Sequence, residues 1–502
     1  MRHDILGADW EAFLFGKNGL FQRDAGLIWL GVLFFLSLAV ALPRVYATDE
    51  VQYYAWLRSV YFDHDVDFRN EYTTFAQLNP HSGIAESLLQ PNRIRERTGL
   101  YGNIAPVGSA LLWAPWFAAA DLLLRGAHLV GIGLNVAADG FSWPYQRAIA
   151  YASACYAWFG LLIVRRVSMQ WVSRWSSTVA TIAIWLATPL VFYMTVQMPF
   201  AHANGFFLTA CFVWCWWRIQ QPDHQWYVWA MLGAIGGGMF LVREQLILFA
   251  VLPLMIVVER LWHHRSHLTW EHTRNDVLRW SVAAVCAAVM LLPQIAAYQA
   301  LNGTPMPATE VSGKLNLCSP HALDTLVDFD PRPSAWCGVS DEPVQIPAWS
   351  RGALVWSPIL AVALVGLVWF TRRYPWQGGA MLAAIALQVW INGAFGTTWH
   401  LSGAFGFRRL IECSPFFIVG LAYLVERSQV HVPRWSIGAC LLLFVAGNMG
   451  LIVNATVFNQ STQLRRGLSW PQLWQWQWEL PGKLWLKGSE IFDRCRIVKN
   501  SC

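Results

Sequence analysis

The chain has 502 residues, of which 56% are hydrophobic and only 13% are charged, and its mean hydropathy is +0.36. Soluble domains carry roughly 25% charged residues, so this composition excludes a soluble globular protein and predicts a polytopic membrane protein. The net charge of +6 does not indicate a nucleic-acid partner, because basic residues of membrane proteins mostly set topology. No basic block or aromatic stacking platform accompanies it.

Residues 1–25 are mixed and amphipathic and lack a small-residue cleavage pattern, so we interpret them as a cytoplasmic interfacial segment. A membrane span needs roughly 17–25 apolar residues. Eleven apolar stretches are predicted as spans: Gly26–Leu42, Gln146–Val164, Ser176–Val196, Met198–Trp217, Trp226–Val242, Gln245–Arg260, Trp280–Tyr298, Ala353–Phe370, Gln377–Phe395, Leu410–Val425 and Trp435–Val457.

Arginines in the short loops predict the orientation. The basic loops all fall on one side if a twelfth apolar stretch, Ile104–Leu124, does not cross the membrane. That stretch is interrupted by Pro106 and Pro115, and we predict a re-entrant or juxtamembrane helix there. The alternative is that it crosses and a later short run does not. The basic side is then cytoplasmic, and the loops 43–145 and 299–352 and the Trp-rich tail 458–502 face outside.

None of the ten cysteines has metal-binding spacing. Cys318 and Cys337 share the second outer loop, and Cys495 and Cys502 share the tail. In an oxidising compartment each pair could form a disulfide, and we favour Cys318–Cys337.

Two acidic clusters follow the first span. Asp49 and Glu50 lie a few residues beyond it, where Thr48 or Asp49 could simply cap a helix. The functional interpretation is a base for an acceptor hydroxyl, because burial can raise a carboxylate pKa into a useful range. Asp65 and Asp67 follow in the same loop. They either solvate the loop or bind a divalent cation.

Basic residues in the short outer loops oppose the topology rule, so something should hold them there. Arg243 lies at the outer junction of two spans, and Arg408 and Arg409 lie in a short outer loop. They could pair with neighbouring acids, Arg243 with Glu244 and Arg408 with Glu412. We favour a clamp on an anionic head group, most simply a phosphate.

Four further residues belong to the candidate site. Lys314 could add a positive charge to the clamp, or be merely solvated in its long loop. Tyr53, His202 and His400 are predicted as substrate-binding residues, and both histidines fit hydrogen-bonded interfacial residues better than metal ligands. The chain has no convincing protease, serine-hydrolase, P-loop or dinucleotide-binding motif.

An ordered set of short motifs resembles the GT-C superfamily of membrane glycosyltransferases, whose members include the aminoarabinose transferase of lipid A and the protein O-mannosyltransferases. His64, Glu244 and Phe407 depart from the motif pattern. The resemblance covers about residues 26–425, and its motifs are Asp49–Glu50, Asp63–Asp67, Pro106–Gly108, Ala201–Asn204, Arg243–Gln245, Trp356–Pro358 and Gly406–Arg409.

The resemblance implies an all-α GT-C fold over residues 26–457, with about 11–13 transmembrane helices and a helical first outer loop. It implies an inverting transfer from a polyprenyl-phosphate sugar to a hydroxyl of a glycan, lipid or protein acceptor. Asp49 would be the base, and Glu50 would orient it, hold a metal or bind acceptor. We expect a bacterial inner membrane, a periplasmic site and no certain cofactor, although Asp65 and Asp67 could hold a divalent cation. The alternative is a transporter or flippase of a lipid-linked glycan.

Overall fold

The computed structural model describes residues 24–222, 225–263, 270–308, 315–319, 321–327, 352–395, 399, 401, 403–458, 468 and 470–488. Within these ranges the secondary structure is helical, without a β-strand. The first part contains α2 (Ala25–Ala39), α3 (Thr48–Arg58), η1 (Ser59–Asp63), α4 (Arg69–Leu78), α5 (Ile84–Leu88), η2 (Pro91–Arg93), α6 (Gly108–Leu129), α7 (Trp143–Ser168), α8 (Arg174–Leu186), α9 (Pro189–Thr195) and α10 (Ala201–Arg218). The second part contains α11 (Trp226–Val242), η3 (Glu244–Ala250), α12 (Val251–His263), α13 (Trp270–Asn302), α15 (Ala353–Trp356), α16 (Ile359–Arg373), α17 (Pro375–Gly393), η6 (Arg408–Cys413), α18 (Ser414–Ser428), α19 (Arg434–Thr456) and α21 (Trp470–Lys487).

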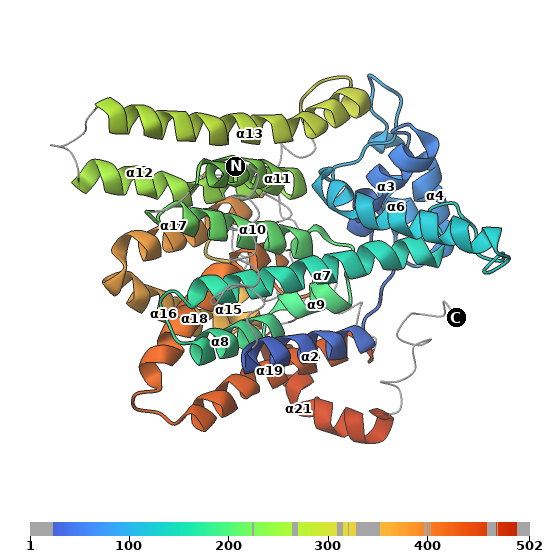
Figure 1. Ribbon diagram of the computed structural model, residues 1–502. Coiled ribbons are helices and arrows are strands. Elements are labelled where there is room, and N and C mark those ends of the chain that lie inside the picture. Colours follow the sequence, from blue (N-terminus) through green and yellow to red (C-terminus); the bar gives the residue numbers. More distant parts are fainter. Residues whose placement is uncertain are drawn as a thin grey trace.

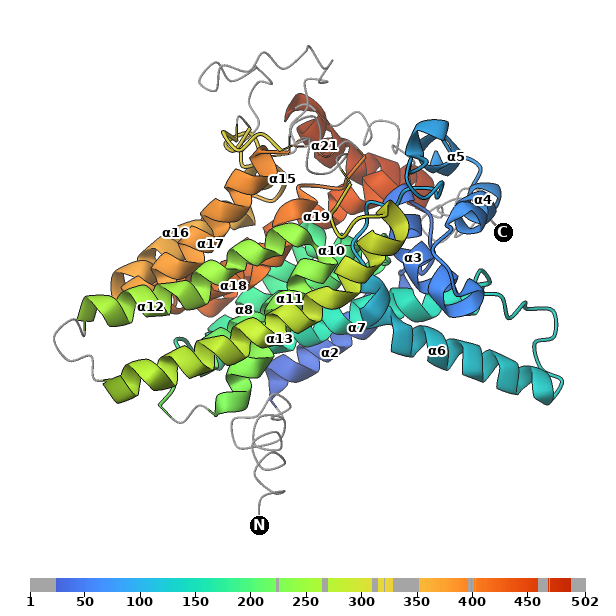
Figure 2. The same cartoon turned by 90° about the horizontal axis from the view of Figure 1, so that it is seen from above.

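The helices form a bundle with a smaller helical module at one end. Most long helices run roughly side by side, while α3, α4 and α6 gather at one end of them (Figure 1). The view turned by 90° keeps α3, α4 and α5 at that same end (Figure 2). We call residues 43–145 the first-loop module, and the end of the bundle that carries it the module end. The predicted helical first loop is thereby confirmed.

The bundle and the module have separate hydrophobic cores. The module core contains many aromatic side chains, and Tyr54 contacts Phe75 and Phe117 edge-on at ring-centroid distances of 5.4 and 5.9 Å. The Tyr54 hydroxyl donates to the Gly140 carbonyl, so its polar end is satisfied inside the core. A loop with its own core is a rigid support for side chains that point at the bundle.

Among the residues that the structure describes, four helical segments are long and apolar enough to cross a membrane, judged by length and composition: 143–168, 244–263, 274–302 and 434–456. Helices α8 and α9 form a fifth candidate that is bent by 69°. The bend has a local cause, because Thr188 caps α9 and Pro189 begins it without a backbone donor. Other predicted spans match shorter apolar helices, such as α2 with 15 residues and α11 with 17. Eleven crossings therefore remain a prediction, while the multi-helical membrane architecture is confirmed.

The segment predicted not to cross forms α6, which begins at Gly108 and is not among the candidate spans. Its first turn lies directly on α11. A Cβ at Gly108 would come within 2.4 Å of the Leu241 carbonyl carbon, so only glycine permits this approach. The contact fixes the module against the residues that immediately precede Arg243.

Candidate active site

The acidic pair lies in the first turn of α3, at the point where the module meets the bundle. Glu50 is 1% exposed, and its Oε2 accepts from the backbone N–H groups of Tyr46 at 2.6 Å and Ala47 at 2.9 Å. Glu50 therefore stabilises the start of the helix, and the alternative in which Thr48 or Asp49 caps it is wrong. Burial raises the pKa of Glu50 to about 7.

Asp49 takes a different position from its neighbour. Its side chain is 39% exposed, and its Oδ2 accepts a hydrogen bond from Arg408 Nη2 at 2.7 Å. This salt bridge joins the module to the bundle across 359 positions of sequence. Asp49 is thus an accessible carboxylate that one arginine of the bundle holds in place.

A glycine turn delivers Arg408 and Arg409 to this point. Gly406 has φ = 60°, and a Cβ there would lie 2.5 Å from Pro189 Cγ, so the turn requires glycine. The Arg408 guanidinium then lies 4.8 Å from the centroid of the Phe200 ring. The Arg409 guanidinium lies 4.6 Å from the centroid of the Phe395 ring. Both contacts have cation–π geometry, which retains a cation in a partly dry site.

Arg243 enters the cluster from a break between α11 and η3, where its backbone is extended (φ −156°, ψ 115°). It is 8% exposed, and its Nη1 donates to Glu412 Oε1 at 3.1 Å. Arg243 Nη1 also contacts His202, whose Nδ1 lies 3.1 Å from the same Glu412 oxygen. The predicted alternative in which Arg243 pairs with Glu244 is wrong, because Glu244 accepts from Tyr298 instead.

The alternative in which Arg408 pairs with Glu412 is also wrong. Arg408 takes Asp49 as its partner, and Glu412 takes Arg243. Arg408 and Glu412 are four residues apart, and in the 3₁₀ turn η6, which has three residues per turn, such side chains point in different directions.

Tyr53 lies one turn after Asp49 on α3, and its hydroxyl is in the electrostatic field of Asp49, Arg243 and Arg408. Burial raises the pKa of Tyr53 to about 12, so the hydroxyl remains a hydrogen-bond donor at neutral pH. The structure therefore brings together seven residues from α3, α10, the junction of α11 and η3, and η6. We call them the arginine cluster: Asp49, Tyr53, His202, Arg243, Arg408, Arg409 and Glu412.

A second network holds α3 inside the module. Arg58, in the last turn of α3, donates from Nη1 to Asp63 and, at 3.0 Å, to Glu71 Oε1. Its guanidinium lies 4.2 Å from the centroid of the Phe141 ring. Burial raises the pKa of Glu71 to about 7. The network fixes the end of α3 remote from Asp49.

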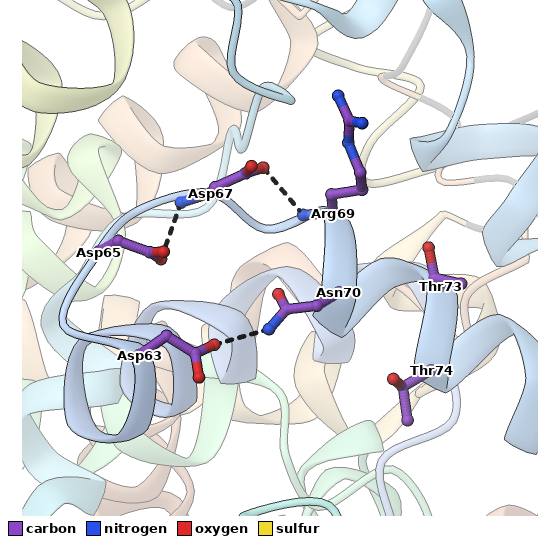
Figure 3. Close-up of a pocket in the computed structure, with 7 residues that line it drawn as sticks. All are labelled: Asp63, Asp65, Asp67, Arg69, Asn70, Thr73 and Thr74. Atoms are coloured by element: carbon purple, nitrogen blue, oxygen red, sulfur yellow. Dashed lines mark hydrogen bonds between the residues drawn. The ribbon is translucent and has the colours of Figure 1, made fainter.

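The other acidic cluster opens into a shallow cavity of about 520 Å³ on the module, separate from the arginine cluster. Asp65 Oδ1 accepts from Ser59 Oγ at 2.7 Å. It also accepts from the Asp67 backbone N–H at 3.1 Å, and Asp67 Oδ1 accepts from the Arg69 backbone N–H at 3.2 Å (Figure 3). These are the bonds of a solvated turn. The cavity is lined by Asp63, Asp65, Asp67, Arg69, Asn70, Thr73 and Thr74.

Across the described residues, no three His, Cys, Asp or Glu side chains lie close enough together to hold a metal ion. The predicted cation at Asp65 and Asp67 therefore remains a prediction, with local hydrogen bonds already using one oxygen of each carboxylate.

Three predicted site residues, Lys314, His400 and Cys337, lie outside the described residues. Cys318 is disulfide-bonded, while the cysteines of the helices, such as Cys215 and Cys413, are free. The pairing Cys318–Cys337 itself stays a prediction.

Sequence reasoning missed two contributors. Glu412 was considered only as a neighbour of Arg408, although it is 1% exposed and serves Arg243 and His202. Tyr193 was not considered, yet it lies in the field of Arg408 and stacks obliquely on His202 with ring centroids 5.0 Å apart. The sequence could have identified Glu412, because it is an acid in an apolar stretch shortly after two arginines. Nothing in the sequence distinguishes Tyr193.

No protein-family model matches the chain, and no curated protein matches it. Among solved structures, ArnT from Cupriavidus metallidurans in the apo state is 14% identical, with 93% of this chain and 76% of that chain covered and a TM-score of 0.46. The Archaeoglobus fulgidus oligosaccharyltransferase AglB, in complex with an inhibitory peptide and a dolichol-phosphate, is 12% identical, with 88% and 56% covered and a TM-score of 0.48.

This chain thus spans little more than half the length of the oligosaccharyltransferase. Another structure of that ArnT, bound to undecaprenyl phosphate, aligns with 14% identity over 94% and 77% of the two chains and a TM-score of 0.43. Both proteins are membrane glycosyltransferases of the superfamily that the sequence motifs resemble. At these identities and TM-scores the alignments transfer no residue role to this chain.

Proposed function

We propose that the protein is an inverting glycosyltransferase that moves a sugar from a polyprenyl-phosphate donor to an acceptor hydroxyl at the module end. One observation carries the proposal. An accessible carboxylate, Asp49, lies 2.7 Å from Arg408, beside two further arginines that come from separate elements of an apolar helical bundle. A carboxylate and several guanidinium groups at one end of such a bundle suit the reaction of an anionic lipid head group with a hydroxyl.

In the proposed reaction the arginines act on the leaving phosphate and Asp49 acts on the acceptor hydroxyl. The acceptor oxygen forms a bond to the anomeric carbon while the bond from that carbon to the phosphate oxygen breaks, and its electron pair leaves with the lipid phosphate. Arg408, Arg409 and Arg243 stabilise the negative charge that develops there, because fixed cations in a partly dry site need no reorganisation. Asp49 takes the acceptor proton, and attack opposite the leaving phosphate inverts the anomeric carbon.

The other groups of the cluster support this division of roles. Tyr53 and His202 line the cluster as hydrogen-bonding partners for the sugar or the phosphate. Glu50 is committed to the start of α3, so it orients Asp49 rather than acting as a base itself.

The distribution of basic residues supports an extracytoplasmic site. Helix α16 leads to α17, and α18 leads to α19, at the end remote from the module (Figure 1). These turns carry Arg372, Arg373, Arg427 and Arg434, and positive loops remain in the cytoplasm. The module end and its arginine cluster would then face the periplasm of a bacterial inner membrane.

Single-turnover transfer from a panel of synthetic polyprenyl-phosphate sugars tests the proposal, with wild type and Asp49→Asn measured side by side. We expect transfer by wild type and a loss of about 10²–10⁴-fold in the variant, which is the usual contribution of a general base. Glu86→Gln is the matched control, since it removes one charge from an exposed position of the module.

Retained turnover by Asp49→Asn would remove Asp49 from the mechanism. If wild type neither transfers nor binds any of the donors, the transferase proposal fails and the transporter or flippase takes its place.

A further inference from the structure

The Asp49–Arg408 salt bridge joins two groups that the proposed reaction uses for different partners. Arg408 should face the phosphate of the donor, and Asp49 should face the hydroxyl of the acceptor. In the structure without substrate they face each other, with 2.7 Å between Nη2 and Oδ2. A phosphate that approaches Arg408 therefore meets the like charge of Asp49 beside its binding partner.

The two acid–arginine pairs of the cluster differ in how firmly they are enclosed. The side chains of Glu412 and Arg243 are 1% and 9% exposed, while those of Asp49 and Arg408 are 39% and 18% exposed. Glu412 is also confined by α10, where a Cβ at Gly205 would lie 3.0 Å from its Cγ. Glu412 is therefore a fixed counter-ion, whereas Asp49 has open space into which it can move.

Asp49 can leave Arg408 without disturbing the helix that carries it. The start of α3 depends on Glu50, which accepts the two preceding backbone N–H groups. The other end of α3 is held by Arg58. A change in the Asp49 side chain alone is enough to open the pair.

We propose that Asp49 occupies the donor-phosphate position on Arg408 in the resting protein, and that the incoming phosphate displaces it and so releases the base for the acceptor hydroxyl. This inference rests on the proposed transferase function and adds that the donor phosphate binds before the acceptor hydroxyl is deprotonated. A donor phosphate and an available base then occur together, and an acceptor that arrives first meets a carboxylate still paired with Arg408.

Asp49→Asn should lose transfer and at the same time gain affinity for a lipid phosphate. The probe is farnesyl phosphate, titrated into the purified full-length protein in detergent, with farnesol and inorganic phosphate to separate the lipid tail from the head group. In wild type the phosphate must compete with Asp49 for Arg408, and in Asp49→Asn this competitor is removed. Because a partly exposed ion pair is weak, the gain should be small, and we expect Asp49→Asn to bind farnesyl phosphate about two- to fivefold more tightly than wild type. Glu86→Gln should leave the affinity unchanged.

A double-mutant cycle attributes the gain to the pair. Arg408→Gln should weaken binding, and adding Asp49→Asn to it should give no further tightening, because Asp49 then has no cation to cover. Asp49→Ser must change the affinity in the same direction as Asp49→Asn, which guards against a fault peculiar to one variant. Partial unfolding would expose apolar surface and raise the affinity for farnesol as well, so unchanged farnesol binding assigns the gain to the head group.

The outcomes separate the two proposals. If wild type binds farnesyl phosphate but Asp49→Asn and Asp49→Ser bind it equally or less tightly, displacement is refuted and the transferase proposal stands. Equal tightening in the Arg408→Gln background also refutes displacement. If wild type binds neither farnesyl phosphate nor inorganic phosphate, the arginine cluster is not a phosphate site and both proposals fail.

Discussion

Glu412→Gln tests whether the buried carboxylate is the counter-ion that keeps Arg243 in the protein interior. Both side chains are almost fully enclosed, at 1% and 9% exposure, and their atoms meet at 3.1 Å. Glutamine keeps the size of the side chain and removes its charge, which leaves the Arg243 guanidinium buried beside Arg408 and Arg409. Breaking one partner out of a buried ion pair costs about 3–5 kcal/mol, so we expect a destabilisation of that order.

The assay is thermal unfolding in detergent followed by intrinsic fluorescence, for which the chain has 31 tryptophans. The midpoint of Glu412→Gln should fall by several degrees, while that of Glu86→Gln should stay at the wild-type value. Removal of both charges in Glu412→Gln with Arg243→Met should recover most of the loss, because an apolar replacement leaves no uncompensated ion.

A Glu412→Gln midpoint equal to that of wild type would refute this reasoning. It would mean that His202 or solvent, rather than Glu412, balances the charge of Arg243. A double variant less stable than the single one would refute it as well, since the arginine would then stabilise the fold without its acid.

Two other changes should affect the same region in predictable ways. Gly406→Ala puts a Cβ 2.5 Å from Pro189 Cγ on a residue with φ = 60°, so we expect a loss of about 1–3 kcal/mol and of transfer, measured by unfolding and turnover. Gly438→Ala is the control, because it lies in α19 with nothing within 4 Å, and it should not destabilise the protein. Glu50 has its pKa raised from 4.5 to about 7, so the stabilisation it contributes is complete below about pH 4.5 and is lost as the pH rises through 7. Relative to Glu50→Gln, wild type should therefore become less stable between pH 5 and 8 by at most about 3 kcal/mol, at 1.36 kcal/mol for each pKa unit; parallel midpoint profiles for the two proteins would exclude Glu50 as the titrating group.

The large-scale organisation was readable from the sequence because apolar length and arginine placement are one-dimensional signals. Helix α11 begins at Trp226 and ends at Val242 as its apolar run predicted. The stretch from Ser176 to Val196 was predicted as one span, but it is split into α8 and α9. The Thr-Pro step that bends it is visible in the sequence, yet only packing decides whether proline kinks a helix or begins a new one.

The sequence identified several residues that the structure brings together, but it did not indicate how they pair. Asp49, Arg243 and Arg408 were identified because each charge lies where an apolar chain should avoid it. Their partners could not be read from spacing, because residues adjacent in sequence, such as Arg243 and Glu244, turn to opposite sides at a helix break. The bond between Asp49 and Arg408 depends on how the module sits on the bundle, which no local pattern encodes.

The origin of the arginine cluster in distant parts of the chain has a consequence for biosynthesis. The ribosome delivers Asp49 first, then Arg243 and last Arg408. A nascent chain can complete most of the aromatic core of the module once α7 has emerged, since all but two residues of that core precede α8. The charges of the arginine cluster are complete only after η6 is in place, so a chain that stops before η6 lacks part of the proposed phosphate site.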